Sequence, residues 1–293
     1  MTALARASTQ SLVDTVALVK PRITLLTLIT AAAGIFLAPG QAEPARIAVA
    51  LLGIALLVGG ANALNMFLER DTDLLMARTR DRPLPGKRLS PEFVLGFGSV
   101  LIGLSIPILT YLVNPLTGAL GALSLVSYVL FYTPLKRKSS LALWVGAVPG
   151  AMPPLLGWTS VTGQVGLPAL VLFGIIFFWQ IPHFLAIGIF RKEEYARAGI
   201  KVYTLEAEPR QIQRQILIYT LALVAVSYGL IPLRAAGNLY LATATVLGGI
   251  FLVYAVLGFR ARDLEEWARR LFLISLLYLT LLFSVLFIDG GAA

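Results

Sequence analysis

Amide and carboxylate side chains recur every four residues where one apolar segment of the sequence ends. Asn65, Glu69 and Asp73 follow this spacing. On an α-helix a step of four residues turns the side chain by only about 40°, so the three groups would lie on one face. Their oxygens suit Mg²⁺, which makes the stripe a candidate metal site. The plainer alternative is a solvated helix end, but Glu69 and Asp73 would repel each other at this spacing without a nearby cation.

Cationic side chains follow this stripe and recur after a later apolar segment. Arg78 and Arg82 are one helical turn apart, and Lys136 and Arg137 come soon after Tyr132. Guanidinium groups bind phosphate oxygens with two hydrogen bonds, and such donors stabilise a diphosphate as it leaves. The sequence therefore predicts that a phosphorylated substrate meets the metal here. For Tyr132, Lys136 and Arg137 an aromatic belt with cytoplasmic cations is an equally good interpretation.

The composition indicates a membrane protein. Hydrophobic residues make up 58% of the chain and charged residues only 13%, against about 25% charged in soluble domains. Apolar stretches long enough to cross a bilayer predict an all-α, multi-pass transmembrane bundle in a single domain, residues 1–293. We expect nine spans, at about 19–38, 46–68, 93–113, 116–134, 141–158, 167–190, 215–234, 239–258 and 270–289.

The distribution of lysine and arginine predicts the orientation of these spans. With a cytoplasmic N-terminus, 22 of the 24 cations fall on the inner side, and only Arg46 and Arg234 fall outside. This pattern favours nine spans, a C-terminus outside and an active site facing the cytoplasm, in a bacterial-type inner membrane. The net charge of +9 then reflects topology, so no nucleic-acid partner is expected. The chain contains no cysteine, which excludes thiolate ligands and thiol nucleophiles.

His183 is the only histidine in the chain and lies in an apolar run. A polar ring is costly there, which favours a functional role over a structural one. It could contact a haem iron, bond to a propionate or transfer a proton. Lys20, at the start of the first span, has two interpretations, an interface anchor or a contact to an anionic substrate.

These residues together resemble a known family. The pattern Asn65-x3-Glu69-x3-Asp73, followed by Arg78 and Arg82, is similar to the first signature of the UbiA-type intramembrane prenyltransferases. Three further segments resemble the branch of that family that attaches a farnesyl group to haem. They are Lys20-Pro21-Arg22, Tyr132-Thr133-Pro134-Leu135-Lys136-Arg137 and Trp179-Gln180-x-Pro182-His183-Phe184. The resemblance runs from about residue 15 to the last span.

The resemblance implies a reaction and its participants. Farnesyl diphosphate would bind with Mg²⁺ and lose its diphosphate, and a vinyl group of haem B would attack the allylic cation. Water would then complete haem O, for use by a haem A synthase or a terminal oxidase. The site residues implied are Asn65, Glu69 and Asp73 on the metal, Arg78, Arg82, Lys136 and Arg137 on the diphosphate, and Tyr132, His183 and Glu194 at the bound cofactor or substrate.

The sequence also departs from the family pattern. Met66 stands where many relatives have Asp or Asn, and Glu69 replaces the more usual Asp. The second, aspartate-rich signature of the quinone-directed relatives is missing; Glu194 with Tyr195 is the candidate remnant, and the number of magnesium ions, one or two, stays open. Three other functions are also considered: a prenyltransferase for an aromatic or quinone precursor, a membrane transporter with kinked polar helices, and a haem-binding subunit without catalysis.

Overall fold

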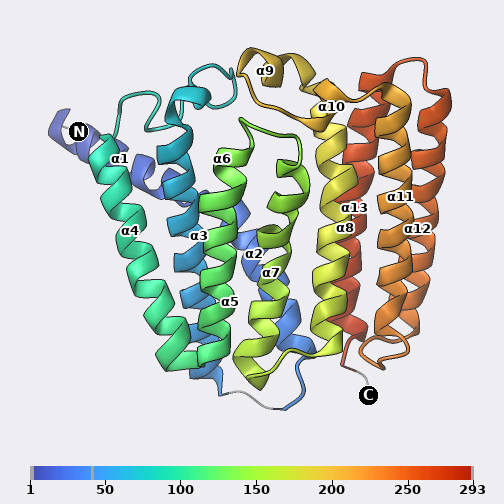
Figure 1. Ribbon diagram of the computed structural model, residues 1–293. Coiled ribbons are helices and arrows are strands. Elements are labelled where there is room, and N and C mark those ends of the chain that lie inside the picture. The colour runs from blue at the N-terminus through green and yellow to red at the C-terminus, as the bar shows by residue number, and fades with distance from the viewer. Residues whose placement is uncertain (1–2, 41–42, 292–293) are drawn as a thin grey trace.

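Long helices running between two opposite ends form the structure, a computed structural model that describes residues 3–40 and 43–291 (Figure 1). The helices are α1 (Ala3–Leu18), α2 (Pro21–Leu37), α3 (Pro44–Asp73), α4 (Pro91–Pro107), α5 (Pro115–Val126), α6 (Thr133–Leu135), α7 (Ala142–Thr162), α8 (Leu167–Phe190), α9 (Lys192–Arg197), α10 (Tyr203–Glu206), α11 (Pro209–Ser227), α12 (Asn238–Leu257) and α13 (Leu264–Asp289). Wider π-helical turns extend α4 over Ile108–Val113 and join α5 to α6 over Ser127–Tyr132.

The predicted multi-pass helical bundle is confirmed. Six of the described helical segments are long and apolar enough to cross a membrane, or seven if the bent pair Ser11–Leu18 and Pro21–Leu37 is one span. Helix also occupies each of the nine ranges expected from the sequence. The number of crossings and their direction stay predictions, because α7 and α11 are not among the helices that satisfy length and composition.

Several helix boundaries differ from those expected, and for two of the helices a local reason is clear. The third helix continues to Asp73, five residues beyond the apolar run, because its last charged side chains pair with cations from other segments. The helix expected over 215–234 begins at Pro209 and ends at Ser227. Glu208 and Gln211 form a reciprocal capping box that fixes its start.

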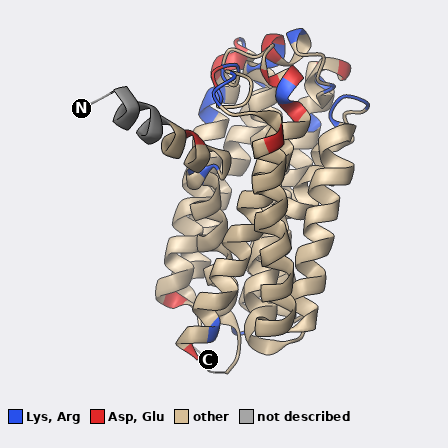
Figure 2. Ribbon diagram, turned by 90° about the vertical axis from the view of Figure 1, so that its left-hand side faces the viewer, with Lys and Arg blue, Asp and Glu red and all other residues tan. Residues whose placement is uncertain are grey.

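Charged residues gather at one end of the bundle, opposite the end that carries the C label (Figure 2). The loops after α3, α6 and α8 lie there, and α9 and α10 extend across that end (Figure 1). The described chain finishes at the opposite end, with α13 (Figure 1). The loops that contain the candidate site residues therefore lie at one end of an apolar bundle.

Helix α7 packs in the middle of the bundle. It contacts α2, α5 and α8, and in Figure 1 it stands between α5 and α8 with α2 passing behind it. Glycine makes its closest approach to α2 possible, because a Cβ atom on Gly157 would lie 1.9 Å from the backbone oxygen of Ala31. Gly34 faces the oxygen of Pro154 at the same calculated distance, 1.9 Å. Small residues therefore let these two backbones touch, as is common between helices in membranes.

This contact predicts the effect of adding a methyl group. Gly157→Ala should lower the free energy of unfolding by about 2–3 kcal/mol, because backbone must move to admit the new carbon. Gly103 in α4 is the matched control, since a Cβ atom there has no neighbour within 4 Å, so Gly103→Ala should be neutral or slightly stabilising. Thermal unfolding of both variants in detergent measures the difference. Equal stability of the two would show that the α2–α7 approach is not tight.

Candidate active site

The stripe Asn65, Glu69 and Asp73 occupies the last turns of α3, at the charged end. Asn65 and Asp73 are almost completely buried, with 2% and 1% of their surface exposed. The Glu69 side chain is 14% exposed. The three groups face inward, as their spacing predicts, and buried carboxylates need partners because desolvation of an unpaired charge is costly.

Each polar group of the stripe has a cationic partner from a different segment. Lys136, just after α6, donates from Nζ to Oε1 of Glu69 at 2.8 Å. Arg82, in the loop after α3, donates to Oδ2 of Asp73 at 2.7 Å. Lys20, between α1 and α2, donates to Oδ1 of Asn65 at 3.3 Å. The repulsion between the two carboxylates is therefore balanced by Lys136 and Arg82, which come from two separate parts of the chain, while Lys20 binds the neighbouring amide.

The electrostatics keep Lys136 charged. Burial alone would lower the pKa of Lys136, but Tyr132 and the Glu69 carboxylate act in the opposite direction and raise it above its ordinary value. The ammonium group also lies 4.4 Å from the centre of the Tyr132 ring, in a cation–π contact. Its positive charge is thus a fixed feature of the site.

The donor set fits Mg²⁺ bound together with phosphate. Oδ1 of Asp73 is buried and has no hydrogen-bond partner among the described residues. No group of three or more His, Cys, Asp or Glu side chains that could hold a metal occurs in residues 3–40 and 43–291. Mg²⁺ in proteins commonly takes one or two carboxylates and completes its shell with water and substrate phosphates. Asp73, with Glu69 and Asn65 beside it, can supply such a partial shell.

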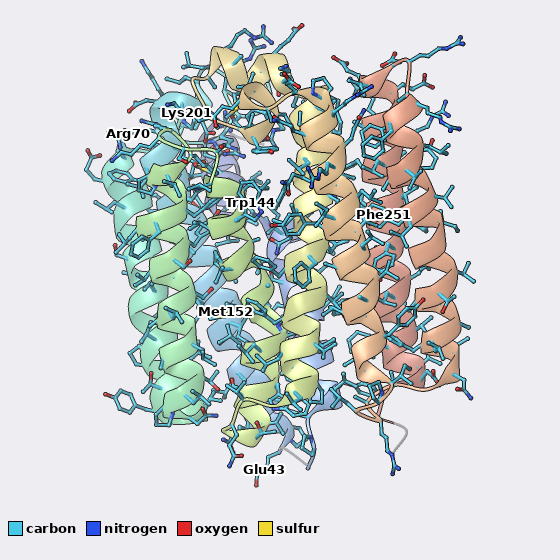
Figure 3. All side chains as sticks on the ribbon, turned by 45° about the vertical axis from the view of Figure 1, so that its right-hand side comes forward. Glu43, Arg70, Trp144, Met152, Lys201 and Phe251 are labelled. Carbon is cyan, nitrogen blue, oxygen red and sulfur yellow. The ribbon has the colours of Figure 1, made fainter. Side chains whose placement is uncertain are left out.

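A cavity of about 300 Å³ opens beside the stripe. Residues from α9, α10 and the segment between them form its roof, including Tyr195 and Lys201. Met76 packs there against Ile200, so the loops after α3 and α8 close over the cavity together. Figure 3 shows Lys201 at the charged end of the bundle, with Trp144 nearer its middle.

The charge of this cavity is strongly positive. The cavity has only two carboxylates, Glu69 and Asp73, against five cations in its wall, a net charge of +3. The five cationic residues are Lys20, Arg78, Arg82, Lys136 and Lys201. A site of this kind binds a compact polyanion and discriminates against cations and neutral molecules.

A second cavity of about 260 Å³ continues from the first into the bundle. The two share several wall residues, among them Lys20, Tyr128, Tyr132 and Phe184. Deeper walls are apolar and come from α3 and α7, with Ile54, Leu57 and Leu156. We call the first the polar chamber and the second the apolar chamber. Together they suit a molecule with an anionic head and a long hydrocarbon tail.

Most of the predicted site residues meet at the polar chamber. Asn65, Glu69, Asp73, Arg78, Arg82, Tyr132 and Lys136 all line it. Arg137 does not line it and instead donates to the hydroxyl of Thr72. Glu194 pairs with Arg191 at 3.5 Å, whereas its neighbour Tyr195 reaches the cavity wall.

His183 lies apart from this group. Its ring faces α13, where Nδ1 is 2.8 Å from the hydroxyl oxygen of Ser275. The Trp179 and Phe272 rings flank it, with centroids 4.5 Å and 4.7 Å away. His183 lines neither chamber, although Phe184 lines both. The structure thus does not bring His183 to the other predicted site residues, and a contact between its ring and haem stays a prediction.

Several wall residues were not among the predicted site residues. Tyr128 and Lys201 line the polar chamber, and Gln180 lines the apolar one. Lys20 lines both, with a left-handed backbone at φ 47° and ψ 69°. The sequence signals for Lys20 are its place at the start of the first span and the family resemblance of Lys20-Pro21-Arg22. The structure favours contact with an anionic group over a simple interface anchor.

Comparison with known proteins identifies the family. A sequence model of the UbiA prenyltransferase family matches residues 27–277. The chain belongs to the UbiA prenyltransferase family. It is therefore a prenyltransferase, and the alternatives of a transporter and a non-catalytic haem-binding subunit lose their support.

Curated relatives cover almost the whole chain. A protein from Sorangium cellulosum named protoheme IX farnesyltransferase is 56% identical over 84% of this chain and 88% of its own length. One of the same name from Anaeromyxobacter sp. is 48% identical over 99% of this chain and 98% of its own. The relative of that name from Myxococcus xanthus is also 48% identical, over 94% of each chain.

Solved structures agree on the fold. A structure described as digeranylgeranylglyceryl phosphate synthase superposes with a TM-score of 0.82 at 12% identity, covering 96% of this chain and 98% of that chain. A UbiA homolog from Archaeoglobus fulgidus bound to GPP and Mg²⁺ gives a TM-score of 0.65 at 15% identity, covering 93% and 99%. These likenesses support the UbiA fold and its membrane-embedded helices.

The buried pair Lys136–Glu69 predicts an asymmetric effect on stability. Lys136→Met should destabilise the protein by about 3 kcal/mol, because it leaves the Glu69 carboxylate without its partner. Adding Glu69→Gln to that variant should restore much of the loss. The exposed pair Arg270–Glu266 is the matched control, and Arg270→Met should change stability by less than about 0.5 kcal/mol. Thermal unfolding of the four proteins tests this, and an equal effect of Lys136→Met and Arg270→Met would contradict the pairing.

Proposed function

We propose that this protein transfers the farnesyl group of farnesyl diphosphate to a vinyl group of haem B and so produces haem O. The single observation that carries the choice of substrates is the 48% identity, over nearly the full length of both chains, to a relative named protoheme IX farnesyltransferase. The two chambers supply the physical basis. One is cationic and fits a diphosphate, and the other is apolar and fits an isoprenoid chain.

The polar chamber matches the donor's head group. A diphosphate ester carries about three negative charges near neutral pH, so it suits a wall in which cationic side chains outnumber carboxylates. Arg78 and Lys201 have no salt-bridge partner among the described residues, so they are available to phosphate oxygens. Arg82 and Lys136 hold the carboxylates and still line the cavity. All these charges are in place before the reaction, so they stabilise the departing diphosphate without rearrangement.

The stripe of α3 would hold the metal. Asn65, Glu69 and Asp73 are the proposed Mg²⁺ ligands, and the unpaired Oδ1 of Asp73 is the first oxygen available to it. When bound, Mg²⁺ supplies positive charge to the phosphate oxygens and weakens the bond to the prenyl carbon. The UbiA homolog from Archaeoglobus fulgidus solved with GPP and Mg²⁺ supports this pairing of metal and substrate.

The reaction balances with one water. Cleavage of the carbon–oxygen bond gives diphosphate and an allylic cation, and the vinyl carbon of haem B forms the new carbon–carbon bond. The resulting cation, next to the porphyrin, takes a hydroxyl from water, and the remaining proton goes to the released diphosphate. The apolar walls around Ile54, Leu57 and Leu156 keep bulk water from the first cation.

The acceptor molecule distinguishes the proposed activity from that of a prenyltransferase for an aromatic or quinone precursor. Haem B and an aromatic acid can be offered separately to purified protein with farnesyl diphosphate and Mg²⁺. Mass analysis should find a farnesylated, hydroxylated haem and no prenylated acid. The reverse result would assign the protein to the aromatic-acceptor function.

The location and the downstream partners are part of the proposal. The charged end with the polar chamber would face the cytoplasm of a bacterial-type inner membrane, because 22 of 24 cations belong to that side in the nine-span topology. Haem O leaving this site would pass to a haem A synthase or a terminal oxidase.

Asp73 should be essential for turnover and dispensable for insertion. Asp73→Asn removes the charge proposed to hold Mg²⁺ and should lower the rate of haem conversion by at least about 100-fold. Asp81→Asn is the control, because the Asp81 side chain is 84% exposed in the same loop region. The rate of product formation from farnesyl diphosphate and haem B is measured for both variants. Wild-type conversion by Asp73→Asn would overturn the metal role.

Two arginines close in sequence should differ in their effect on donor binding. Arg78 lines the polar chamber, whereas Arg80 has a 63% exposed side chain and does not line it. Arg78→Gln should raise the KM for farnesyl diphosphate about tenfold or more, since a charge-assisted bond to phosphate is lost. Arg80→Gln should leave it unchanged. Identical KM values for the two variants would remove Arg78 from the diphosphate site.

A further inference from the structure

Two buried amide side chains face the apolar chamber. Asn62 is 4% exposed and Gln180 is 6% exposed, and both belong to its wall. Asn62 comes from α3 and Gln180 from α8, so the chamber lies between them. Buried amides in an otherwise hydrocarbon-lined space are costly unless they bind something polar.

The oxygen of Gln180 is held in one direction. Nε2 donates to the backbone oxygens of Ala147 and Ile176, at 3.1 Å and 3.2 Å, which orients the amide. Oε1 then lies beside Gly150, where an added Cβ atom would be only 2.1 Å away. Gly150 therefore makes room for the Gln180 oxygen, and both residues line the chamber.

Asn62 supplies an unused donor. Its Nδ2 is buried and has no hydrogen-bond partner among the described residues. A buried donor is unfavourable when it stays unsatisfied, so its presence calls for a polar ligand. In this wall the oxygen of Gln180 and the nitrogen of Asn62 offer one acceptor and one donor.

Both amides lie one helical turn below the polar chamber. Asn62 precedes Asn65 by three residues, or about 4.5 Å along α3. Gln180 meets Gly150, which follows Gly146 by one turn of α7, and Gly146 lies against Tyr132. The two amides are therefore at the same depth, just inside the charges that would hold the diphosphate. The prenyl carbon released from that diphosphate would react at this level.

Proline adds further acceptors at this depth. Pro153 and Pro154 lack the N–H groups that would bond to the carbonyls of residues 149 and 150 in a regular helix. Pro149 and Gly150 both line the chamber. A water molecule needs two to four polar partners to remain in such a space, and these groups with the two amides provide that number.

We propose that Asn62 and Gln180 are positioning residues that hold the water which captures the carbocation after the prenyl group has joined the acceptor. This inference rests on the proposed function. The water oxygen forms the new bond to the cationic carbon, and its extra proton passes to the diphosphate released in the same turnover. One water is consumed, and one haem product and one protonated diphosphate leave.

The proposal predicts a second product when the water is lost. The same cation can instead lose a proton from the adjacent methylene group, which forms a double bond. This eliminated product is lighter than haem O by one water. The ratio of eliminated to hydroxylated product is set within each turnover, so it does not depend on how much of a variant folds.

The test measures that ratio for purified variants supplied with farnesyl diphosphate, haem B and Mg²⁺ in water enriched in oxygen-18. Wild-type protein should give mainly the hydroxylated product, labelled with the heavy isotope. Asn62→Leu and Gln180→Met should each raise the ratio of eliminated to hydroxylated product by about tenfold or more. Asn62→Ser, which keeps a donor, should return it toward the wild-type value.

Gln213→Met is the matched control. Gln213 is also a buried amide, 5% exposed, but it donates to the oxygen of Gly258 and lines neither chamber. Gln213→Met should therefore give the wild-type ratio of eliminated to hydroxylated product. An unchanged ratio of eliminated to hydroxylated product in Gln180→Met, or in Asn62→Leu where that variant accumulates, would overturn the proposal. Variants that insert and bind the donor normally but form neither product would also overturn it. Wild-type protein that forms no farnesylated haem would instead contradict the proposed function.

Discussion

The structure depends on the cost of burying charge at the edge of a membrane bundle. Glu69 and Asp73 lie inside it, and each carboxylate is kept there by one cation, Lys136 or Arg82. Breaking either pair would leave a desolvated charge, so the segments that carry the partners are fixed relative to α3. A phosphorylated substrate can use the same positive groups, because anionic oxygens are what they already bind. The interactions that order the site are thus of the kind that a phosphorylated substrate would make.

The second constraint is the contrast between the two chambers. The wall of the polar chamber has a net charge of +3, whereas the floor of the next is formed by side chains such as Ile54 and Leu156. α7 makes this change of environment possible. Its glycines admit Tyr132 and Gln180 at the wall, and its prolines lack the N–H groups that would bond to preceding backbone carbonyls. Chemistry that passes through a cation needs both features, an anion clamp at one end and a largely dry space at the other.

The sequence predicted the helical ranges and the central stripe because both follow from spacing. Apolar stretches set the helices, and a step of four residues placed Asn65, Glu69 and Asp73 on one face, where the structure has them. Lys20 could not be assigned to the site in the same way, because it lies 45 positions before Asn65 and outside α3, so no periodic spacing connects the two. Arg137 was predicted from its place beside Lys136, and Glu194 as a remnant of the family's second signature. Neither basis gives the direction of a side chain on so short a segment.

The segment from Trp179 to Phe184 shows most clearly what could not be predicted from the sequence. Trp179 and His183 are four residues apart and share the face toward α13, where both contact Ser275. Gln180 and Phe184 have the same spacing on the adjacent face and line the apolar chamber. A conspicuous histidine in an apolar run attracts a functional interpretation, yet one step of about 100° along the helix decides which neighbour reaches the cavity. Because the histidine packs among aromatic rings, the polarity available next to the reacting carbons comes from amides. Amides neither ionise nor compete as bases, so they can order a single water beside a cation without removing the proton that would end the reaction early.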